Sequence, residues 1–281
     1  MNETSETIGS GVSAPSPHHS EEPAALTTRA QKLDAVDDAS WNQYVASHNV
    51  GRPYQLTAWI RAVEQAYGHA GWGVSAWREG RLAGVLALSL VRRPWGGAEL
   101  VSLPFCDHGG ILADDSRVRD QLHKSAVALA EQLGAQHLEI RALGSAEELD
   151  TASSGGEADT APKVSMQSPL PQDSETLFKQ YKPKLRSQIR KAEKNGLEAR
   201  ISTADSAIDA FYPVFAANMH RLGSPVHSLA WFRALKAHFG DRMIVGQVFS
   251  GERVVGAGIV LMVGKQACIP WASTLAEYNH L

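Results

Sequence analysis

A run of basic side chains is the first feature of the sequence that could do chemistry. The segment KLRSQIRKAEKNGL (184–197) contains a single acid, Glu193. In a helix, Arg186, Arg190 and Lys194 would share one face, because they are spaced four residues apart. Guanidinium groups bind phosphate oxygens in a bidentate manner. The pattern therefore predicts a contact to a phosphate or an RNA backbone, with a solvated helix face as the alternative, through Arg186, Arg190, Lys191 and Lys194.

Two further groups of reactive residues are weaker candidates. Cys106, Asp107 and His108 are residue types of nucleophilic catalysis, but adjacent side chains on an extended segment point to opposite faces. Cys106 and Cys268 are far apart and have the spacing of neither a metal site nor a redox pair. We therefore expect no triad, no metal site and a reducing compartment.

The composition limits the class of protein. A chain of 281 residues with 43% hydrophobic content can form two modest domains with a buried core. A net charge of -3 argues against a dedicated nucleic-acid-binding protein, so any basic function is local. The N-terminal segment lacks the pattern of a signal peptide, and no apolar run is long enough for a transmembrane helix. We expect a cytoplasmic protein.

Two polar segments divide the chain. Residues 1–28 are rich in Ser, Thr, Pro and Glu and have few large apolar side chains, which is typical of a disordered tail. Residues 144–162 have the same character and predict a flexible linker. The expected domains are therefore 29–143 and 163–281.

Hydrophobic periodicity predicts the elements that must position the candidate residues. In the first domain it favours helices at 39–48, 57–67 and 116–133, and strands at 72–77, 82–91, 100–105 and 137–141. In the second domain it favours a helical segment at 174–195 broken near Pro183, helices at 207–221 and 228–239, strands at 197–202 and 267–271, and a hairpin at 243–263. Both domains are thus predicted to mix helices with mainly antiparallel strands.

The sequence repeats itself with an offset of 172 residues. Residues 48–91 align with 220–263 without a gap, and 11 of these 44 pairs are identical. About three identities would be expected from average residue usage. The identical pairs include Gly51/Gly223, Trp59/Trp231 and Gly84/Gly256. We interpret the match as a duplication rather than a chance resemblance.

A second pair of short segments follows the two hairpins. Residues 102–105 read SLPF and residues 268–271 read CIPW. After Pro104 the first copy continues through a predicted helix and strand to Arg141, whereas 11 residues follow Pro270. We therefore expect the second domain to be truncated.

The order of the elements resembles the GNAT acyltransferase fold, and two such units in tandem resemble the FemAB-like family. Four segments resemble the branch associated with exopolysaccharide and PEP-CTERM loci: LVSLPFCDHGGILADD, KLRSQIRKAEKNGL, FYPVFAANMHRLGSPVHSLAWF and IPWASTLAEYN. The resemblance runs from roughly Trp41 to the end, apart from the linker. It implies an α+β fold of two tandem GNAT-like domains with mixed, mainly antiparallel sheets.

The resemblance also implies a reaction. FemAB-like proteins are peptidyl or aminoacyl transferases that use an activated acyl donor to form an amide on a cell-envelope precursor. The implied enzyme is an acyltransferase with no tightly bound cofactor, an aminoacyl-tRNA or acyl-CoA donor, and a phosphorylated glycan or amine acceptor. The basic run is then a candidate contact to tRNA. Such a reaction must position both substrates, stabilise an oxyanion and remove a proton.

Two loops are implied to lie near the substrates. The first contains Arg221 and His227, which are candidates for binding the acceptor and for taking its proton. Trp271, Ser273 and Tyr278 follow the strand where a GNAT sheet splays to admit donor and acceptor. Trp271 is a candidate substrate contact, and Ser273 and Tyr278 are candidate proton relays.

Two other functions fit the same features. One is N-acetylation by a GNAT enzyme that depends on acetyl-CoA. The other is a non-catalytic module that binds a phosphorylated glycan precursor in an export system. The sequence leaves the donor, the acceptor and the oligomeric state open.

Overall fold

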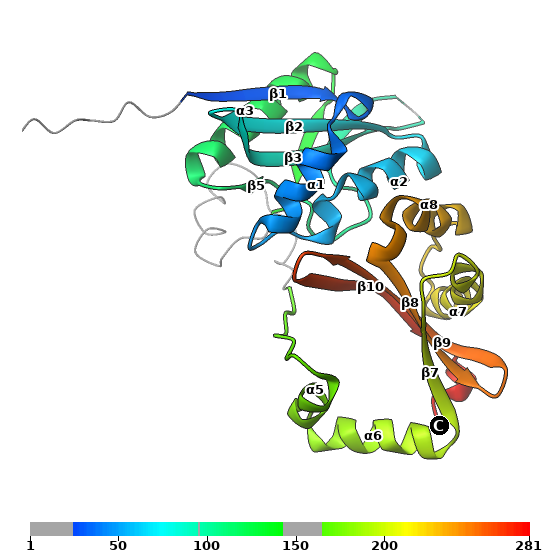
Figure 1. The fold of residues 1–281 in the computed structure, drawn as a ribbon. Helices are drawn as coiled ribbons and strands as arrows, with labels where there is room; N and C mark the ends of the chain where they lie inside the picture. Colours follow the sequence, from blue (N-terminus) through cyan, green and yellow to red (C-terminus); the bar gives the residue numbers. More distant parts are fainter. Residues whose placement is uncertain (1–24, 95, 143–164) are drawn as a thin grey trace, which may run out of the picture.

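Two β-sheets, each formed by one half of the chain, organise the fold (Figure 1). The computed structural model describes residues 25–94, 96–142 and 165–281, so the predicted linker at 144–162 lies outside the described residues. Strand β1 begins at Leu26, within the segment predicted to be a disordered tail. This strand is polar and lies at the edge of its sheet, so it carries no clear alternation of apolar residues that could have predicted it.

The first half, residues 25–142, contains sheet A in the order β1-β2-β3-β4-β6, with β5 paired to β3. Its pairs are antiparallel except the parallel pair β4–β6. Its strands are β1 (Leu26–Lys32), β2 (Ala70–Arg78), β3 (Arg81–Arg92), β4 (Ala98–Ser102), β5 (Leu112–Ala113) and β6 (His137–Ile140). Its helices are η1 (Leu33–Ala35), α1 (Asp38–Ser47), η2 (Pro53–Gln55), α2 (Thr57–Tyr67) and α3 (Ser116–Gln132).

The second half, residues 165–281, contains sheet B in the antiparallel order β10-β9-β8-β7. Its strands are β7 (Leu197–Ser202), β8 (Met243–Ser250), β9 (Arg253–Val263) and β10 (Gln266–Thr274). Its helices are α5 (Ser174–Gln180), α6 (Pro183–Lys194), α7 (Ser206–Leu222), α8 (Leu229–Phe239), η3 (Gly240–Arg242) and η4 (Ala276–Tyr278). The predicted break near Pro183 is confirmed, because this proline occupies the first turn of α6.

The two hairpins have the same register, as a duplication requires. The register of β2–β3 shifts between Ala76 and Trp77, and that of β8–β9 shifts between Val248 and Phe249, which are the residues given by the 172-residue offset. Helices α2 and α8 also begin and end at residues related by this offset. A β-bulge at the same position of both hairpins is a specific feature that supports duplication over chance.

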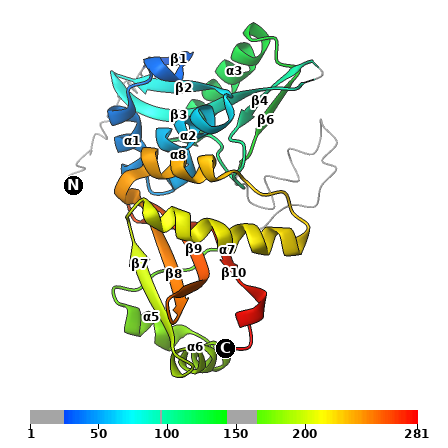
Figure 2. The ribbon, with the colours of Figure 1, turned by 90° about the vertical axis from the view of Figure 1, so that its right-hand side faces the viewer.

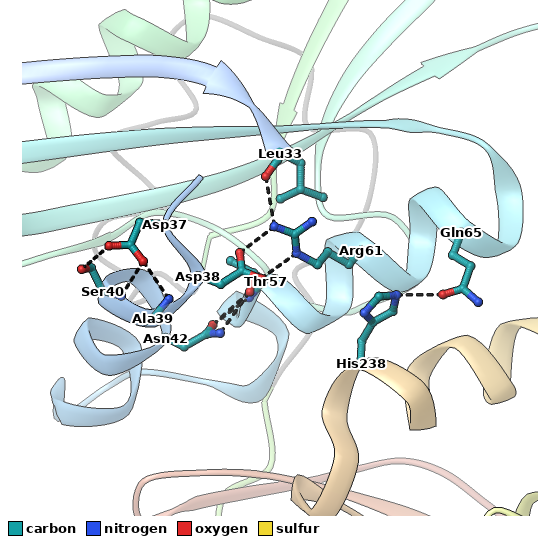
Figure 3. A network of polar contacts seen from close by, with 10 residues as sticks. All are labelled: Leu33, Asp37, Asp38, Ala39, Ser40, Asn42, Thr57, Arg61, Gln65 and His238. Atoms are coloured by element: carbon teal, nitrogen blue, oxygen red, sulfur yellow. Dashed lines mark hydrogen bonds and ion pairs between the residues drawn. The ribbon is translucent and has the colours of Figure 1, made fainter. Parts of the chain in front are cut away.

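One hydrophobic core joins the two halves. Helix α2 lies beside α8, and the buried rings of Trp59 and Trp231 meet edge to face with centroids 5.2 Å apart. The indole nitrogen of Trp59 donates a hydrogen bond to the carbonyl of Pro104 at 3.0 Å. At the surface of the same contact, His238 of α8 and Gln65 of α2 form a hydrogen bond of 2.8 Å (Figure 3). The two sheets are therefore held together through their helices.

Polar contacts fix α1 against α2 (Figure 3). The guanidinium of Arg61 donates to both carboxylate oxygens of Asp38, at 2.7 and 2.8 Å, and to the carbonyl of Leu33 at 3.1 Å. In the second copy, Arg233 of α8 donates to Asp209 of α7 at 2.8 Å. Arg61 and Arg233 are an identical pair of the repeat, and each joins its helix to the preceding α-helix.

Replacement of Trp59 by Ala tests how much the core shared by the two halves contributes to stability. We expect Trp59→Ala to lower the free energy of unfolding by about 3–5 kcal/mol, because it leaves a cavity in the shared core and removes a buried hydrogen bond. Urea unfolding would measure this loss. Val127→Ala is the control, since Val127 is 38% exposed on α3, and it should change the stability by about 0.5 kcal/mol or less. A loss below about 1 kcal/mol for Trp59→Ala would contradict the prediction.

Candidate functional site

His227 lies among aromatic side chains at the junction of the two halves. Its Nδ1 is 2.8 Å from the hydroxyl of Tyr67 in the first half. Its ring centroid is 5.1 Å from that of Phe105, 5.9 Å from that of Trp231 and 6.1 Å from that of Trp271. We call these residues, Tyr67, Phe105, His227, Trp231 and Trp271, the junction cluster. Because Tyr67 and Phe105 belong to the first half, neither half forms the cluster alone.

Local structure places His227 between two helices. Helix α7 ends at Gly223, which has a φ of 69° that glycine adopts at little cost. Helix α8 is capped by Ser228, whose hydroxyl accepts from the backbone N–H of Trp231 at 3.2 Å. The histidine is therefore held in a short connection with a fixed helix end on each side.

Two other members of the cluster occupy irregular backbone. Phe105 has a φ of 66°, a left-handed conformation that costs a non-glycine residue about 1–2 kcal/mol. Trp271 follows a break in the register of β10 between Cys268 and Trp271. Strained residues gather at functional sites more often than elsewhere. The irregular segments carry the two aromatic rings that pack against His227.

Burial sets the charge of His227. It lowers the pKa of the imidazole below the usual 6.5, so the ring is neutral at pH 7. Burial also raises the pKa of the Tyr67 hydroxyl, which stays protonated. If His227 donates from Nδ1 to the Tyr67 oxygen, its Nε2 is free to accept a proton from a substrate. The opposite tautomer would make Nε2 a donor, so the Tyr67 contact decides which role His227 can take.

Ser273 and Arg221 share a hydrogen-bonded network beside this cluster. The amide of Asn218 donates to the buried Ser273 hydroxyl at 3.2 Å, and Arg221 donates to the Asn218 carbonyl oxygen at 2.8 Å. Trp271 and Ser273 are alternate residues of β10, so their side chains lie on one face of the sheet. The structure therefore brings four predicted site residues into one region: Arg221, His227, Trp271 and Ser273.

The basic residues of α6 lie elsewhere. Figures 1 and 2 both show α6 at the end of the second half that is remote from the first half. The Lys191 ammonium donates to the carbonyl of His280 at 2.8 Å, and the Arg190 guanidinium lies 5.4 Å from the ring centroid of Phe178. Arg186 and Lys194 lie on the same helix. Helix α6 fully buries none of its residues, and Arg190, Lys191 and Lys194 are exposed, whereas Arg186 is partly buried.

Tyr278 is placed with this basic end. The Arg253 guanidinium donates to its hydroxyl at 3.1 Å and lies 5.3 Å from its ring centroid. Tyr278 lies in η4, two residues before the His280 carbonyl that Lys191 binds. Among the described residues, no contact joins Tyr278 to His227. The three candidate proton-transfer residues are therefore not gathered in one place.

The segment around Cys106 shows no arrangement for nucleophilic catalysis. Its thiol donates to the carbonyl of Leu103 at 3.4 Å, and burial raises the pKa of Cys106 to about 12. A thiol that stays protonated is a poor nucleophile.

Across the part of the chain that the structure describes, no group of three or more His, Cys, Asp or Glu side chains is placed to hold a metal ion. Over the same residues, no helix is long and apolar enough to span a bilayer.

Sequence reasoning did not identify Tyr67, Phe105 and Trp231 as site residues. The signals for them were present, since Trp231 is one of the identical repeat pairs and SLPF aligned with CIPW pairs Phe105 with Trp271. What the sequence did not show is that the side chains of Tyr67, Phe105 and Trp231 lie beside His227 in the folded chain.

A pocket of about 230 Å³ lies in the first half, lined by residues such as Arg29, and includes no predicted site residue.

The depressed pKa of His227 predicts how stability depends on pH. Below 6.5 the unfolded chain binds a proton that the folded chain does not, so the free energy of unfolding falls as the pH falls, by up to about 1.4 kcal/mol per pH unit for one histidine. We expect His227→Gln to show a smaller loss of stability between about pH 7 and about pH 5. Urea unfolding over this range would test it, and equal losses in both proteins would contradict it.

Comparison with known proteins bears on the family and the fold. A model of the FemAB family matches residues 157–246, and none of the curated proteins matches the chain. The crystal structure of FemX superposes with a TM-score of 0.67 at 12% identity, over 90% of this chain and 82% of that chain. A putative lysylphosphatidylglycerol synthetase domain from Agrobacterium fabrum gives 0.40 at 9% identity over 70% of this chain and 59% of its own, too weak to define the fold. The family match covers part of the second half, and the fold shared with FemX is an α+β fold of two tandem GNAT-like units.

Proposed function

We propose that the chain is a FemAB-like acyltransferase that forms an amide on an amine of a cell-envelope or exopolysaccharide precursor. The observation that carries the proposal is the neutral, half-buried His227 at the junction of the halves. This histidine, with α6 and α7, lies in the segment that matches the FemAB family model. Trp271, Ser273 and Tyr278 lie outside that segment, so their roles rest on geometry alone.

The residues of the junction suit amide formation. In the reaction, the acceptor amine attacks the carbonyl carbon of the donor, the new C–N bond forms, and the C–O or C–S bond to the donor's carrier breaks. His227 Nε2 takes the proton that the amine loses and returns it to the leaving oxygen or sulfur. The Ser273 hydroxyl accepts from Asn218, so its own proton is free to be donated to the carbonyl oxygen. The rings around His227 exclude water from the reacting amine.

The basic helix α6 completes the proposal as a phosphate contact. It carries Arg186, Arg190, Lys191 and Lys194 and lies at the end of the second half that is remote from the first half, whereas His227 contacts Tyr67 of the first half. A substrate that places a phosphate at α6 and its reacting group at His227 must be extended. Aminoacyl-tRNA and a phosphorylated glycan precursor both have this form, and Tyr278 beside α6 then contacts the phosphorylated end rather than relaying a proton.

Loss of the proposed base should reduce turnover much more than binding. We expect His227→Gln to lower kcat by about 10²–10⁴-fold with a small change in KM, because general-base catalysis acts in the transition state. The acidic limb of the pH–rate profile of the unmodified enzyme should lie below 6.5, since only neutral His227 accepts a proton. Transfer to an amine-bearing precursor would be measured with aminoacyl-tRNA and with acetyl-CoA side by side.

His238→Gln is the matched control for this experiment. His238 is also a partly buried histidine with a pKa lowered by burial, but it bonds Gln65 at the outer edge of the α2–α8 contact. We expect its turnover to stay within about twofold of the unmodified enzyme. Turnover with acetyl-CoA but not with aminoacyl-tRNA would show that the reaction is N-acetylation rather than aminoacyl transfer. Equal losses of turnover in His227→Gln and His238→Gln would contradict the assignment of His227 as the base.

Charge reversal on α6 tests the phosphate contact. We expect Arg190→Glu with Lys194→Glu to weaken binding of a phosphorylated precursor or tRNA by at least about tenfold, and to reduce the dependence of affinity on salt. Lys265→Glu is the control, because it also reverses a positive charge but lies on the exposed turn between β9 and β10. Binding that is equally strong in all variants would show that α6 is only a solvated surface.

A further inference from the structure

The pocket of about 230 Å³ in the first half is separate from the junction cluster. It lies between the β1–β2 edge of sheet A and the segment that begins α1. None of its lining residues belongs to the junction cluster or to the second half. Drug-sized ligands occupy pockets of about 300–1,000 Å³, so a cavity of this size admits a smaller molecule, of about one ring. The transfer reaction proposed above makes no use of it.

Two indole rings line the pocket, and each is fixed by a hydrogen bond at its nitrogen. The Trp41 nitrogen donates to the carbonyl of Gln55 at 2.8 Å. The Trp77 nitrogen donates to the hydroxyl of Ser75 at 2.9 Å. These hydrogen bonds hold the ring planes in place, so the aromatic surface is formed before any ligand binds.

The Ser75 hydroxyl is a buried polar group of the pocket lining. Ser75 is 8% exposed, and it accepts the hydrogen bond from Trp77. A hydroxyl also has a proton to donate, and no described residue accepts the proton of Ser75. A buried donor that makes no hydrogen bond costs about 1–3 kcal/mol. This proton is therefore available to an oxygen atom of a ligand in the pocket.

One cation lines the outer part of the pocket. Arg29 is exposed, and its guanidinium lies 5.1 Å from the ring centroid of Trp77. Arg29 and Ser75 are register partners on β1 and β2, so their side chains share the face of sheet A that bears the pocket. Arg29 forms no ion pair with a described residue, and its planar group of donors is free to bind ligand oxygens.

One anion lies opposite in the chemistry of the lining. The Asp37 carboxylate caps α1 and accepts from Ala39 and Ser40 (Figure 3). Hydrogen bonds from Ser40 lower the pKa of Asp37, so the carboxylate is charged at neutral pH. A carboxylate has about four acceptor positions, and three hydrogen bonds leave room for one more. The pocket thus offers both donors and an acceptor beside its aromatic rings.

We propose that this pocket binds one sugar ring of a glycan, at a site separate from the transfer reaction. A sugar ring has an apolar C–H face that packs against an indole, and hydroxyls around its edge that both donate and accept. Arg29 and Ser75 donate to ring-edge oxygens, and Asp37 accepts from a hydroxyl. A phosphate would bring its negative charge beside Asp37, and a hydrocarbon would leave the polar groups unpaired. The sugar satisfies the aromatic and the polar groups together.

Titration of the full chain with glucose, N-acetylglucosamine and glucuronic acid tests the sugar site. The indole N–H signal of Trp77 in a proton–nitrogen NMR spectrum, assigned with Trp77→Phe, reports on the pocket directly. We expect at least one of the three sugars to shift this signal saturably. Ser75→Ala and Arg29→Ala should each weaken the binding by at least about threefold, because each removes a donor to the sugar. Asp37→Asn should weaken it as well while keeping the cap of α1.

Ser89→Ala and Arg81→Ala are the matched controls. Ser89 is a buried serine of β3, Arg81 is an exposed arginine at the start of the same strand, and neither lines the pocket. Both variants should bind the sugar within about twofold of the unmodified chain. Circular dichroism would check that each variant is folded. Because Arg29 is exposed, Arg29→Ala still tests the site if Ser75→Ala is unstable.

Three results would overturn the proposal. The first is no saturable shift of the Trp77 signal with any of the three sugars. The second is equal binding in Arg29→Ala and Arg81→Ala, since the sugar would then lie elsewhere. The third is saturable binding of a free amino acid such as L-alanine in place of the sugars, because one cation and one anion also suit a zwitterion. His227→Gln should leave sugar binding unchanged, so the sugar site and the proposed base are tested independently.

Discussion

Helices α2 and α8 meet through Trp59 and Trp231, and the arrangement of the two sheets depends on this contact. Each helix packs against its own sheet on one side and against the other helix on the opposite side. The indole rings of Trp59 and Trp231 are therefore fully buried. Aromatic side chains of this size supply a large apolar area at one point of contact. The halves consequently share one core rather than touching at a polar surface.

The candidate site is a consequence of the same contact. Tyr67 ends α2, and His227 precedes α8, so packing the two helices side by side brings their ends together. The apolar surroundings that stabilise the junction also lower the pKa of His227, because a charged imidazole would lose hydration there. Packing of the halves and the chemical state of the histidine therefore have one physical cause.

The duplicated hairpin has different surroundings in the two sheets of the described structure. In sheet A both faces are buried, one by α1 and α2 and the other by α3. In sheet B the described residues bury one face, and small residues replace Val74 and Leu86 on the other. The register and the bulge are retained because backbone hydrogen bonds fix them, while side chains on a face follow whatever covers it.

The sequence by itself determined the local structure and the duplication. Periodicity, glycine and proline placed α2, α8 and the break at Pro183, because these signals act over a few residues. The repeat offset indicated the duplication, and the structure then showed that the two hairpins share their register and their bulge. Only the tertiary structure placed Tyr67 against His227, which are 160 residues apart, and set Tyr278 beside α6. Such contacts depend on how two sheets pack through their helices, and no local pattern in the sequence encodes that geometry.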